Sequence, residues 1–464
     1  MKKFMLAAIT GAIATGWAGM AAAAVNLDTG TGSGGVYASE LVIPVTTGTA
    51  LGAGAAADQS AVTTLGATFG SGQQAFIRYD LGSGTFVGAP TLTPQAGLNR
   101  VAQISQGGAG QNYVIFAISP ATAADIHLGA GETVTLVGNG INVTNQNAVT
   151  VQYRLYETLT AAVNQTPQSA LKTVSGTLVS FANAINTVFD TTPDAVADVA
   201  AANGPYTAFV PLAGSPTYSR QVSNWHVTYT QRALANGAPT AGAGSILGAT
   251  NSVTISGDWS AAQNVHLHNA ASCSAGSFVT AGTINATKTA ATFANLSAAA
   301  ITANHWYGCF EIAQPNSIAI PVSTYTGLVD LVPANASVTV ADAATSTGKI
   351  VRNGTVLKAA FAEATSAAGV SSAISLTNNG SRAANFTVKC VLNNGSVAGK
   401  PGTLPANTAQ RFGLTAANGL ACPASNVRGL EITFDVPNGS VIGSVVRQNT
   451  STGAAAFDGM VGNQ

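Results

Sequence analysis

Apolar and polar residues alternate along most of the chain in short runs, and this pattern predicts β-strands. The first clear runs cover residues 41–45, 75–79, 113–118, 134–137, 141–144 and 149–156. Gly138, Asn139 and Gly140 separate two of these runs and indicate a hairpin turn, because glycine and asparagine tolerate positive φ. Residues 36–205 are therefore predicted to form an N-terminal β domain of antiparallel sheets.

One segment of this domain, residues 168–189, supports two interpretations. Its apolar residues recur at spacings of three and four, the period of a helix, at Leu171, Val174, Leu178, Phe181, Ile185 and Val188. The same segment is rich in valine, threonine and serine and contains Gly176, a composition that favours a strand. A short helix near 168–189 and a strand both stay open.

Two further β regions follow. Runs at 225–229, 252–255, 265–268 and 318–322 indicate a middle β-sandwich domain over residues 206–345. Runs at 349–351, 373–376, 385–392, 429–436 and 441–446 indicate a C-terminal domain over residues 346–464. Asn353 and Gly354 are expected to form a two-residue hairpin turn, and Asn-Gly pairs recur at 379, 394 and 438. The expected fold class is all-β, with several antiparallel Ig-like β-sandwich domains in tandem.

The N-terminal residues have the features of a secretory signal peptide. Lys2 and Lys3 precede an apolar run that ends near Trp17, and four alanines occupy positions 21–24. A basic start, a short apolar stretch and small residues before the cleavage point are the parts of such a signal, so residues 1–24 are expected to be removed on export. Residues 25–35, rich in Gly, Thr and Ser, are expected to form a flexible leader in preference to a calcium-binding turn that begins at Asp28.

Charged residues are scarce, and this limits the kinds of partner. Only 8% of residues are Asp, Glu, Lys or Arg, against about a quarter in ordinary soluble domains. Removing Lys2 and Lys3 from the 18 basic residues leaves 16 against 18 acidic ones, a net charge of −2. No basic stripe is present for nucleic acid, and no apolar stretch after the signal is long enough for a transmembrane helix. Because so little charge repulsion separates two copies, the composition favours association of the chain with itself. The alternative is a monomer kept soluble by the hydroxyl and amide groups of its many Thr, Ser and Asn residues.

The cysteine content predicts two disulfide bonds. Cys273, Cys309, Cys390 and Cys422 make an even number in a chain expected to enter an oxidising compartment. Four cysteines allow three pairings. We favour Cys273–Cys309 and Cys390–Cys422, because each pair closes a modest loop inside one predicted β domain. A metal site of four free thiols is disfavoured, because no Cys-x-x-Cys spacing occurs.

No enzyme motif is found in the sequence. A Gly-x-Ser-x-Gly turn, a phosphate-binding Gly-x-x-x-x-Gly-Lys loop, a His-Glu-x-x-His helix and a Cys-x-x-Cys-His haem motif are all absent. The 18 carboxylates are scattered, so no pair indicates acid–base catalysis. The chain is therefore expected to be neither an enzyme nor the carrier of an organic cofactor.

The spacing of the histidines is the only pattern that indicates a chemical site, and it predicts a metal site in the middle domain. His266 and His268 are two residues apart on a predicted strand, so both imidazoles should project from one face, as zinc and copper sites often require. His226 is expected on the polar face of its strand, because it alternates with Trp225 and Val227. The predicted metal ligands are therefore His266, His268 and His226. The alternative is that all three are ordinary surface histidines, since no third ligand is fixed by spacing.

The C-terminal residues 379–381, 403–408 and 441–446 resemble the sandwich modules of bacterial cell-surface proteins. The whole chain, rich in Thr, Ala and Gly and poor in charge, is similar in composition to surface-layer proteins of Gram-negative type bacteria. This resemblance implies a non-catalytic subunit of a surface layer or filament on the cell surface. Its main partner would be itself, with envelope glycan or lipopolysaccharide as a further partner. Calcium-driven assembly is not expected, because Gly-Gly-x-Gly-x-Asp repeats are absent. A secreted adhesin or ligand-binding sandwich is the alternative, and an extracellular hydrolase has the least support.

Overall fold

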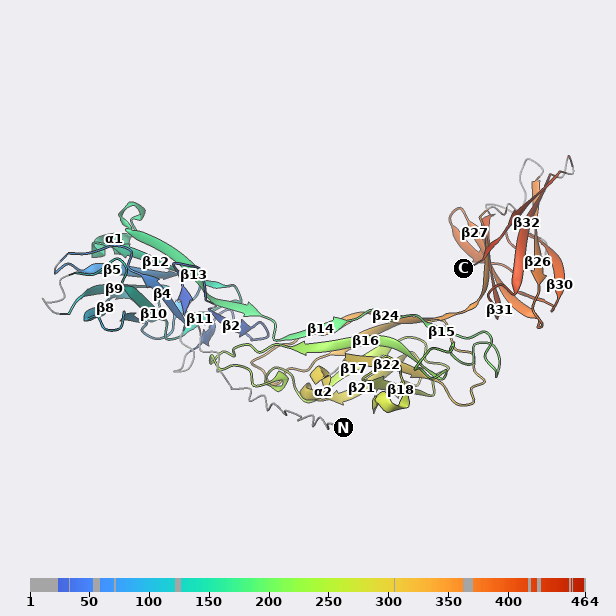
Figure 1. Ribbon diagram of the computed structural model, residues 1–464, viewed down its shortest axis with the longest axis horizontal. Coiled ribbons are helices and arrows are strands. Elements are labelled where there is room, and N and C mark those ends of the chain that lie inside the picture. The colour runs from blue at the N-terminus through green and yellow to red at the C-terminus, as the bar shows by residue number, and fades with distance from the viewer. Residues whose placement is uncertain are drawn as a thin grey trace, which may run out of the picture.

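The computed structural model describes residues 24–462, except 33, 53–58, 71, 122–126, 304, 361, 363–369, 416–418, 424–426, 450, 451 and 453. The predicted signal peptide, apart from Ala24, lies outside the described residues. Three β-rich units follow one another along the molecule (Figure 1). Their sheets are mostly antiparallel, which confirms the all-β, multi-domain fold class.

The N-terminal unit contains three sheets, with strand orders β1-β4-β10-β7, β3-β11-β6 and β2-β13-β12-β5-β9-β8. Tyr79 and Tyr153 lie opposite each other on β5 and β12, and their buried rings are 5.4 Å apart in an edge-on arrangement. The helix α1 packs through Ala162 against Ile115 and Tyr156 on the large sheet. The elements are β1 Val25–Asn26, β2 Gly35–Ala38, β3 Thr49–Leu51, β4 Ser60–Thr64, β5 Ala75–Leu81, β6 Thr85–Phe86, β7 Thr91–Pro94, β8 Arg100–Gly107, β9 Tyr113–Pro120, β10 Thr133–Val137, β11 Ile141–Val143, β12 Val149–Tyr156, α1 Leu159–Asn164, a 3-10 turn Pro167–Ser169 and β13 Lys172–Ala182.

The ambiguous segment 168–189 forms strands, and the helix interpretation is wrong. Residues Lys172–Ala182 form β13, which pairs with β12 on one side and with β2 on the other. A bulge between the pairs Val149–Val179 and Thr150–Thr177 adds one residue to β13, so Leu178 and Val179 are both buried. This extra residue interrupts the alternation, so Leu178 and Phe181 lie three residues apart within one strand.

The described residues of 25–35 are part of the fold, which corrects the expectation of a flexible leader. Val25 and Asn26 pair in parallel with β4. The Asp28 carboxylate accepts hydrogen bonds from the Thr63 hydroxyl and the Thr64 backbone N–H, and Lys172 forms an ion pair with it. The glycines of this segment allow a tight turn rather than flexibility, and Gly30 has φ of +65°.

The middle unit is a sandwich of two sheets with orders β14-β16-β22-β18-β19 and β15-β24-β23-β17-β21-β20. Trp225, Trp259, Trp306, Phe310 and Tyr325 fill its core. The elements are β14 Ile185–Phe189, β15 Ala195–Ala197, β16 Ser219–Tyr229, a 3-10 turn Ala243–Ser245, β17 Asn251–Ser256, β18 Asn264–His268, a 3-10 turn Ala275–Ser277, β19 Phe278–Ala281, β20 Thr283–Ile284, β21 Ala290–Leu296, α2 Ala298–Ala303, β22 His305–Glu311, β23 Ser323–Asp330 and β24 Ala343–Arg352.

The C-terminal unit is a second sandwich, with a core separate from the rest of the molecule. Its sheets have orders β28-β27-β31-β25-β34, with β29 also on β27, and β30-β26-β32-β33. The elements are β25 Gly354–Ala359, β26 Val370–Asn378, β27 Ala384–Leu392, β28 Gly395–Ala398, β29 Gly402–Leu404, β30 Thr408–Gly413, β31 Val427–Pro437, β32 Val441–Asn449, β33 Ala455–Gly459 and β34 Val461–Gly462.

The borders between units differ from those expected at 205/206 and 345/346. Strands β14 and β15 pair with β16 and β24, so the middle unit begins near residue 185. Strand β24 completes the same unit, and the next unit begins at Gly354. Asn353 and Gly354 therefore connect two sandwiches and do not form the expected hairpin turn. At Gly354 a Cβ atom would lie 2.2 Å from the Phe434 carbonyl oxygen, so only glycine fits this close approach.

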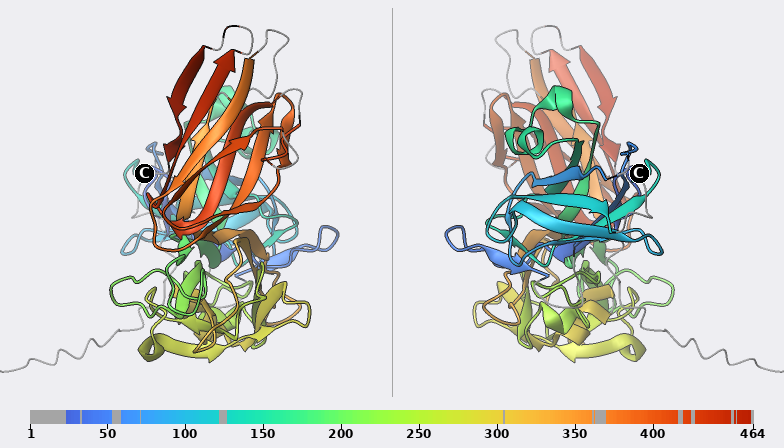
Figure 2. Two further views of the ribbon diagram at one scale, coloured as in Figure 1. Left: turned by 90° about the vertical axis from the view of Figure 1, so that its right-hand side faces the viewer. Right: turned by 90° about the vertical axis from the view of Figure 1, so that its left-hand side faces the viewer.

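The first two units are joined more closely than the last two. Backbone hydrogen bonds link residues 36–42 to 233, 337 and 339, and the buried residues of both units form one continuous cluster. Viewed along the long axis, both end units lie on the same side of the middle unit, so the molecule forms a shallow arc (Figure 2). The N-terminal and C-terminal units thus stand at opposite ends of an elongated chain.

Candidate functional site

The histidines predicted as metal ligands separate into two groups in the structure. His226 lies on β16, directly opposite His305 on β22. His266 and His268 lie on β18, where their register partners on β22 are Cys309 and Tyr307. The set of His266, His268 and His226 is therefore not brought together as one site.

A different set of three side chains does meet, and it consists of Asp190, His226 and His305. His226 Nδ1 lies 2.8 Å from Asp190 Oδ2, and His305 Nδ1 lies 3.5 Å from the same oxygen. The two imidazole centroids are 4.1 Å apart. One potential ligand atom from each of the three side chains lies within 4.8 Å of the others.

The pairing of three adjacent strands produces this cluster. His226 faces Val188 on β14 and His305 on β22. Asp190 comes two residues after Val188, so it continues on the same face of the sheet. Its backbone N–H donates to the Asn224 carbonyl at 3.0 Å, which holds the end of β14 against β16. Asp190 and His305 are not predicted from the sequence, because strand register, not spacing along the chain, brings them to His226.

His266 and His268 share one face, as predicted from their spacing, but both imidazoles are engaged by neighbouring side chains of the protein. His268 is buried, and its Nδ1 is 2.9 Å from the Ser277 hydroxyl. Burial lowers the pKa of His268, and the neighbouring His266 adds to this shift. His266 Nδ1 lies 2.9 Å from Glu311 Oε2, and Phe278 contacts both imidazole rings. Among the described residues, the ligand atoms of His266, His268 and Glu311 do not all come within 4.8 Å of one another.

The disulfides join the favoured pairs, Cys273–Cys309 and Cys390–Cys422. The first bond ties the loop after β18 to β22 in the middle unit. The second ties β27 to the segment before β31 in the C-terminal unit. All four cysteines are buried, each bond lies within one unit, and neither bridges two units.

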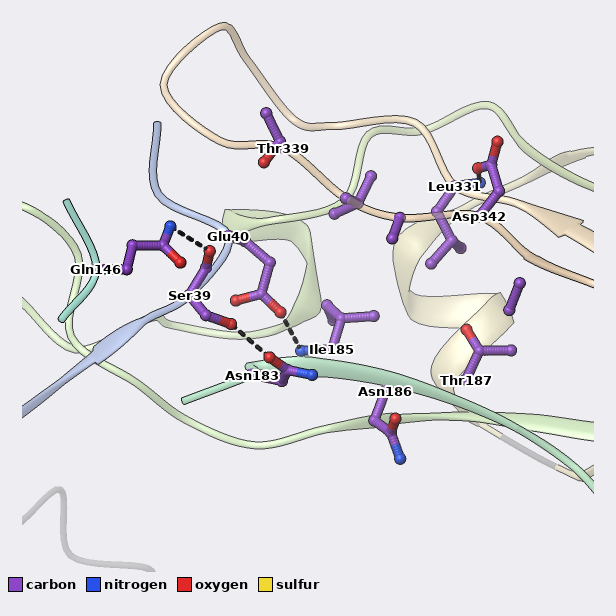
Figure 3. A pocket seen from close by; sticks show the side chains of 13 residues that line it. Ser39, Glu40, Gln146, Asn183, Ile185, Asn186, Thr187, Leu331, Thr339 and Asp342 are labelled. Carbon is purple, nitrogen blue, oxygen red and sulfur yellow. Dashed lines mark hydrogen bonds between the residues drawn. The ribbon is translucent and has the colours of Figure 1, made fainter. Parts of the chain in front are cut away.

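A cavity of about 420 Å³ lies between the N-terminal and middle units (Figure 3). The Glu40 carboxylate points at the connection between β13 and β14, where the chain passes from the N-terminal to the middle unit. It accepts hydrogen bonds from the backbone N–H groups of Ala184 and Ile185. Gln146 donates to the Ser39 carbonyl, and the Ser39 hydroxyl donates to Asn183. Because these polar groups already bind one another or the backbone, the cavity is best explained as a junction between units.

The edges of the sheets are the remaining surfaces that could bind a partner. In the described part of the chain, no strand pairs with the outer edge of β8, the last strand of the large N-terminal sheet. Arg100, its first residue, is bound to Glu132 at 2.7 Å, and residues 101–107 carry no charge. Val101 and Ile104 on this strand are 39% and 41% exposed.

Comparison with known proteins gives no family. No protein-family model matches the chain, and neither does any curated protein. Among the described residues, no helix is long and apolar enough to span a membrane.

Similar solved structures are bacterial surface proteins. One is the C-terminal domain of the AgI/II polypeptide BspA of Streptococcus agalactiae, with 8% identity, 60% of this chain and 84% of that chain covered, and a TM-score of 0.18. Another is BcpA, the major pilin subunit of Bacillus cereus, with 9% identity, coverage of 80% and 95%, and a TM-score of 0.24. Domains 5–6 of the S-layer protein SbsC match with 12% identity, coverage of 63% and 96%, and a TM-score of 0.13. TM-scores this low do not establish a shared fold.

Proposed function

We propose that the protein is a non-catalytic structural subunit that assembles with copies of itself outside the cell, as a filament or surface layer. The single observation that carries this proposal is the edge of β8 at one end of an elongated molecule (Figure 1), where residues 101–107 carry no charge and no described strand pairs with the outer side. An open strand edge presents unpaired backbone N–H and C=O groups that can pair with another chain.

Monomeric proteins usually protect such an edge with charge, proline or a bulge. Residues 101–107 contain no Lys, Asp, Glu or Pro, and the one charged residue of the strand, Arg100, is engaged by Glu132. A bulge between Ile104 and Gln106 is the only protective feature of the strand, and the ladder from 100 to 104 is regular. Residues 101–104 lie in this regular part of the ladder, carry no charge and pair with no described strand on the side away from β9.

A second uncharged edge strand lies on the C-terminal unit. Strand β28 ends the larger sheet there, is exposed over all four residues, Gly395–Ala398, and carries no charge. Contact between two different edges on opposite ends of a molecule is heterologous. Repetition of such a contact produces an open filament, unless the rotation between successive copies closes them into a ring. With only 8% charged residues, little repulsion opposes this contact.

The proposed location rests on the disulfides. Bonds of this kind form and persist in oxidising compartments, and all four cysteines are buried. We therefore place the protein outside the cytoplasm, at the cell surface or in the medium.

The test introduces one charge on the β8 edge. Ile104→Lys should reduce the sedimenting assemblies of the full mature chain, because a lysine on an edge strand opposes pairing with another strand. Val322→Lys is the matched control, since Val322 is 61% exposed but lies outside the described strands. Equal assembly by both variants would refute the β8 contact, and a strictly monomeric parent protein would favour the adhesin or ligand-binding alternative.

A further inference from the structure

We propose that Asp190, His226 and His305 bind one divalent transition-metal ion on the middle unit. This site is independent of the proposed self-assembly, because its residues lie on β16, β22 and the residue after β14, and not on the β8 or β28 edges.

The donor set suits such an ion. Two imidazole nitrogens and one carboxylate oxygen are ligands of zinc and of related first-row metals, and three protein ligands leave a further position for water. In a tetrahedral zinc site with bonds of about 2.1 Å, ligand atoms are about 3.4 Å apart. The two distances from Asp190 Oδ2 to the histidine nitrogens, 2.8 Å and 3.5 Å, lie close to that value.

The cluster is held by the backbone and is open to solvent on one side. The ladder between β16 and β22 fixes the facing positions of His226 and His305, and the hydrogen bond from Asp190 N to Asn224 fixes the end of β14. The His305 side chain is 54% exposed, so an ion can enter without unfolding.

Metal binding replaces a contact that is already present. In the absence of metal, His226 Nδ1 and Asp190 Oδ2 are at hydrogen-bond distance. When Nδ1 binds the ion, a neutral imidazole carries its proton on Nε2, and Asp190 remains an ionised ligand. The ion would then join three neighbouring strands, with β14 as the edge strand of the sheet.

The test is calorimetric titration of the full mature chain with zinc chloride. The parent protein should bind one ion per chain at a saturable site. His305→Gln should weaken this binding by more than about tenfold, the lower end of the loss seen even for groups that only support a metal ligand. His127→Gln is the matched control, because His127 is exposed in the N-terminal unit, far along the chain from the site.

Two further variants make the outcome decisive. Asp190→Asn should weaken zinc binding as His305→Gln does, while His266→Gln should leave it unchanged, because His266 lies in the other histidine group. Intrinsic tryptophan fluorescence checks that each variant keeps the middle unit folded, since Trp225, Trp259 and Trp306 all lie there. Absence of saturable binding to the parent, or undiminished binding to folded His305→Gln and Asp190→Asn, would overturn the proposal.

Discussion

Trp225 and Trp306 stack across β16 and β22 with ring centroids 6.1 Å apart, and the same strand register places His226 opposite His305 on the other face of the sheet. The tryptophans are buried between the two sheets of the middle unit, and the histidines face outward. One pairing thus determines both a core contact and the candidate metal cluster.

Trp306→Ala should destabilise the middle unit by about 3–5 kcal/mol, because it leaves a large cavity in a packed core. Urea unfolding followed by the fluorescence of Trp225 and Trp259 measures this change. Leu212→Ala, which truncates a side chain that is 62% exposed, is the control and should alter stability by less than about 0.5 kcal/mol. Equal stability of the two variants would contradict the assigned core.

The two disulfides should stabilise different units. The bonds close loops of 36 and 32 residues. Each closure lowers the conformational entropy of the unfolded chain, which stabilises the folded unit by about 4 kcal/mol. Replacing Cys273 and Cys309 by serine should therefore move the tryptophan-detected transition to lower urea. Replacing Cys390 and Cys422 should leave that transition in place, because the tryptophans of the described chain all lie in the middle unit. A shift in both variants would show that the C-terminal unit does not unfold separately.

The alternating pattern of the sequence is sufficient to predict the fold class. It does not predict the borders between the three units or the cluster of Asp190, His226 and His305. Alternation of apolar residues predicts β16 and β22. The sequence of either strand does not predict that His226 faces His305, because register depends on contacts far apart in the chain. The bulge at Leu178 accounts for one of the three-residue spacings that a helix would also give. At Asn353 and Gly354 the local turn signal was overridden by packing, since the chain there crosses between two sandwiches.

Asp28 should make the stability of the N-terminal unit depend on pH. Burial opposes its ionisation, but the hydrogen bonds from Lys172, Thr64 and Thr63 outweigh burial and hold the pKa of Asp28 at about 2, below its usual 3.8. Because the folded-state pKa is the lower one, the stabilisation is complete above about pH 4 and is lost as the pH falls toward 2.

The matching experiment compares Asp28→Asn with the parent protein. Hydrogen exchange in β1 and β4 should be faster in the variant at pH 6, and the difference in local stability should vanish near pH 2. Asp194→Asn is the control, because it removes only an exposed ion pair with Lys349. If the difference in hydrogen exchange between Asp28→Asn and the parent persisted unchanged at low pH, the ionised carboxylate would not be the source of the stabilisation.

Glu40 should hold the junction between the N-terminal and middle units. It is buried and accepts from two backbone N–H groups, so Glu40→Gln is expected to cost about 1–3 kcal/mol of local stability. Faster hydrogen exchange at Ala184 and Ile185 is the expected signature. Glu157→Gln, at an exposed position, is the control and should leave both amides unchanged. Unaltered exchange in Glu40→Gln would argue against this role.

Sedimentation of the mature protein over a range of concentrations, at about 0.05 M and about 1 M salt, tests the central claim of self-assembly most directly. Contacts between uncharged strand edges are barely screened, so ordered assemblies should form at both salt concentrations and grow with protein concentration. A monomer at high protein concentration in both solutions would contradict the account.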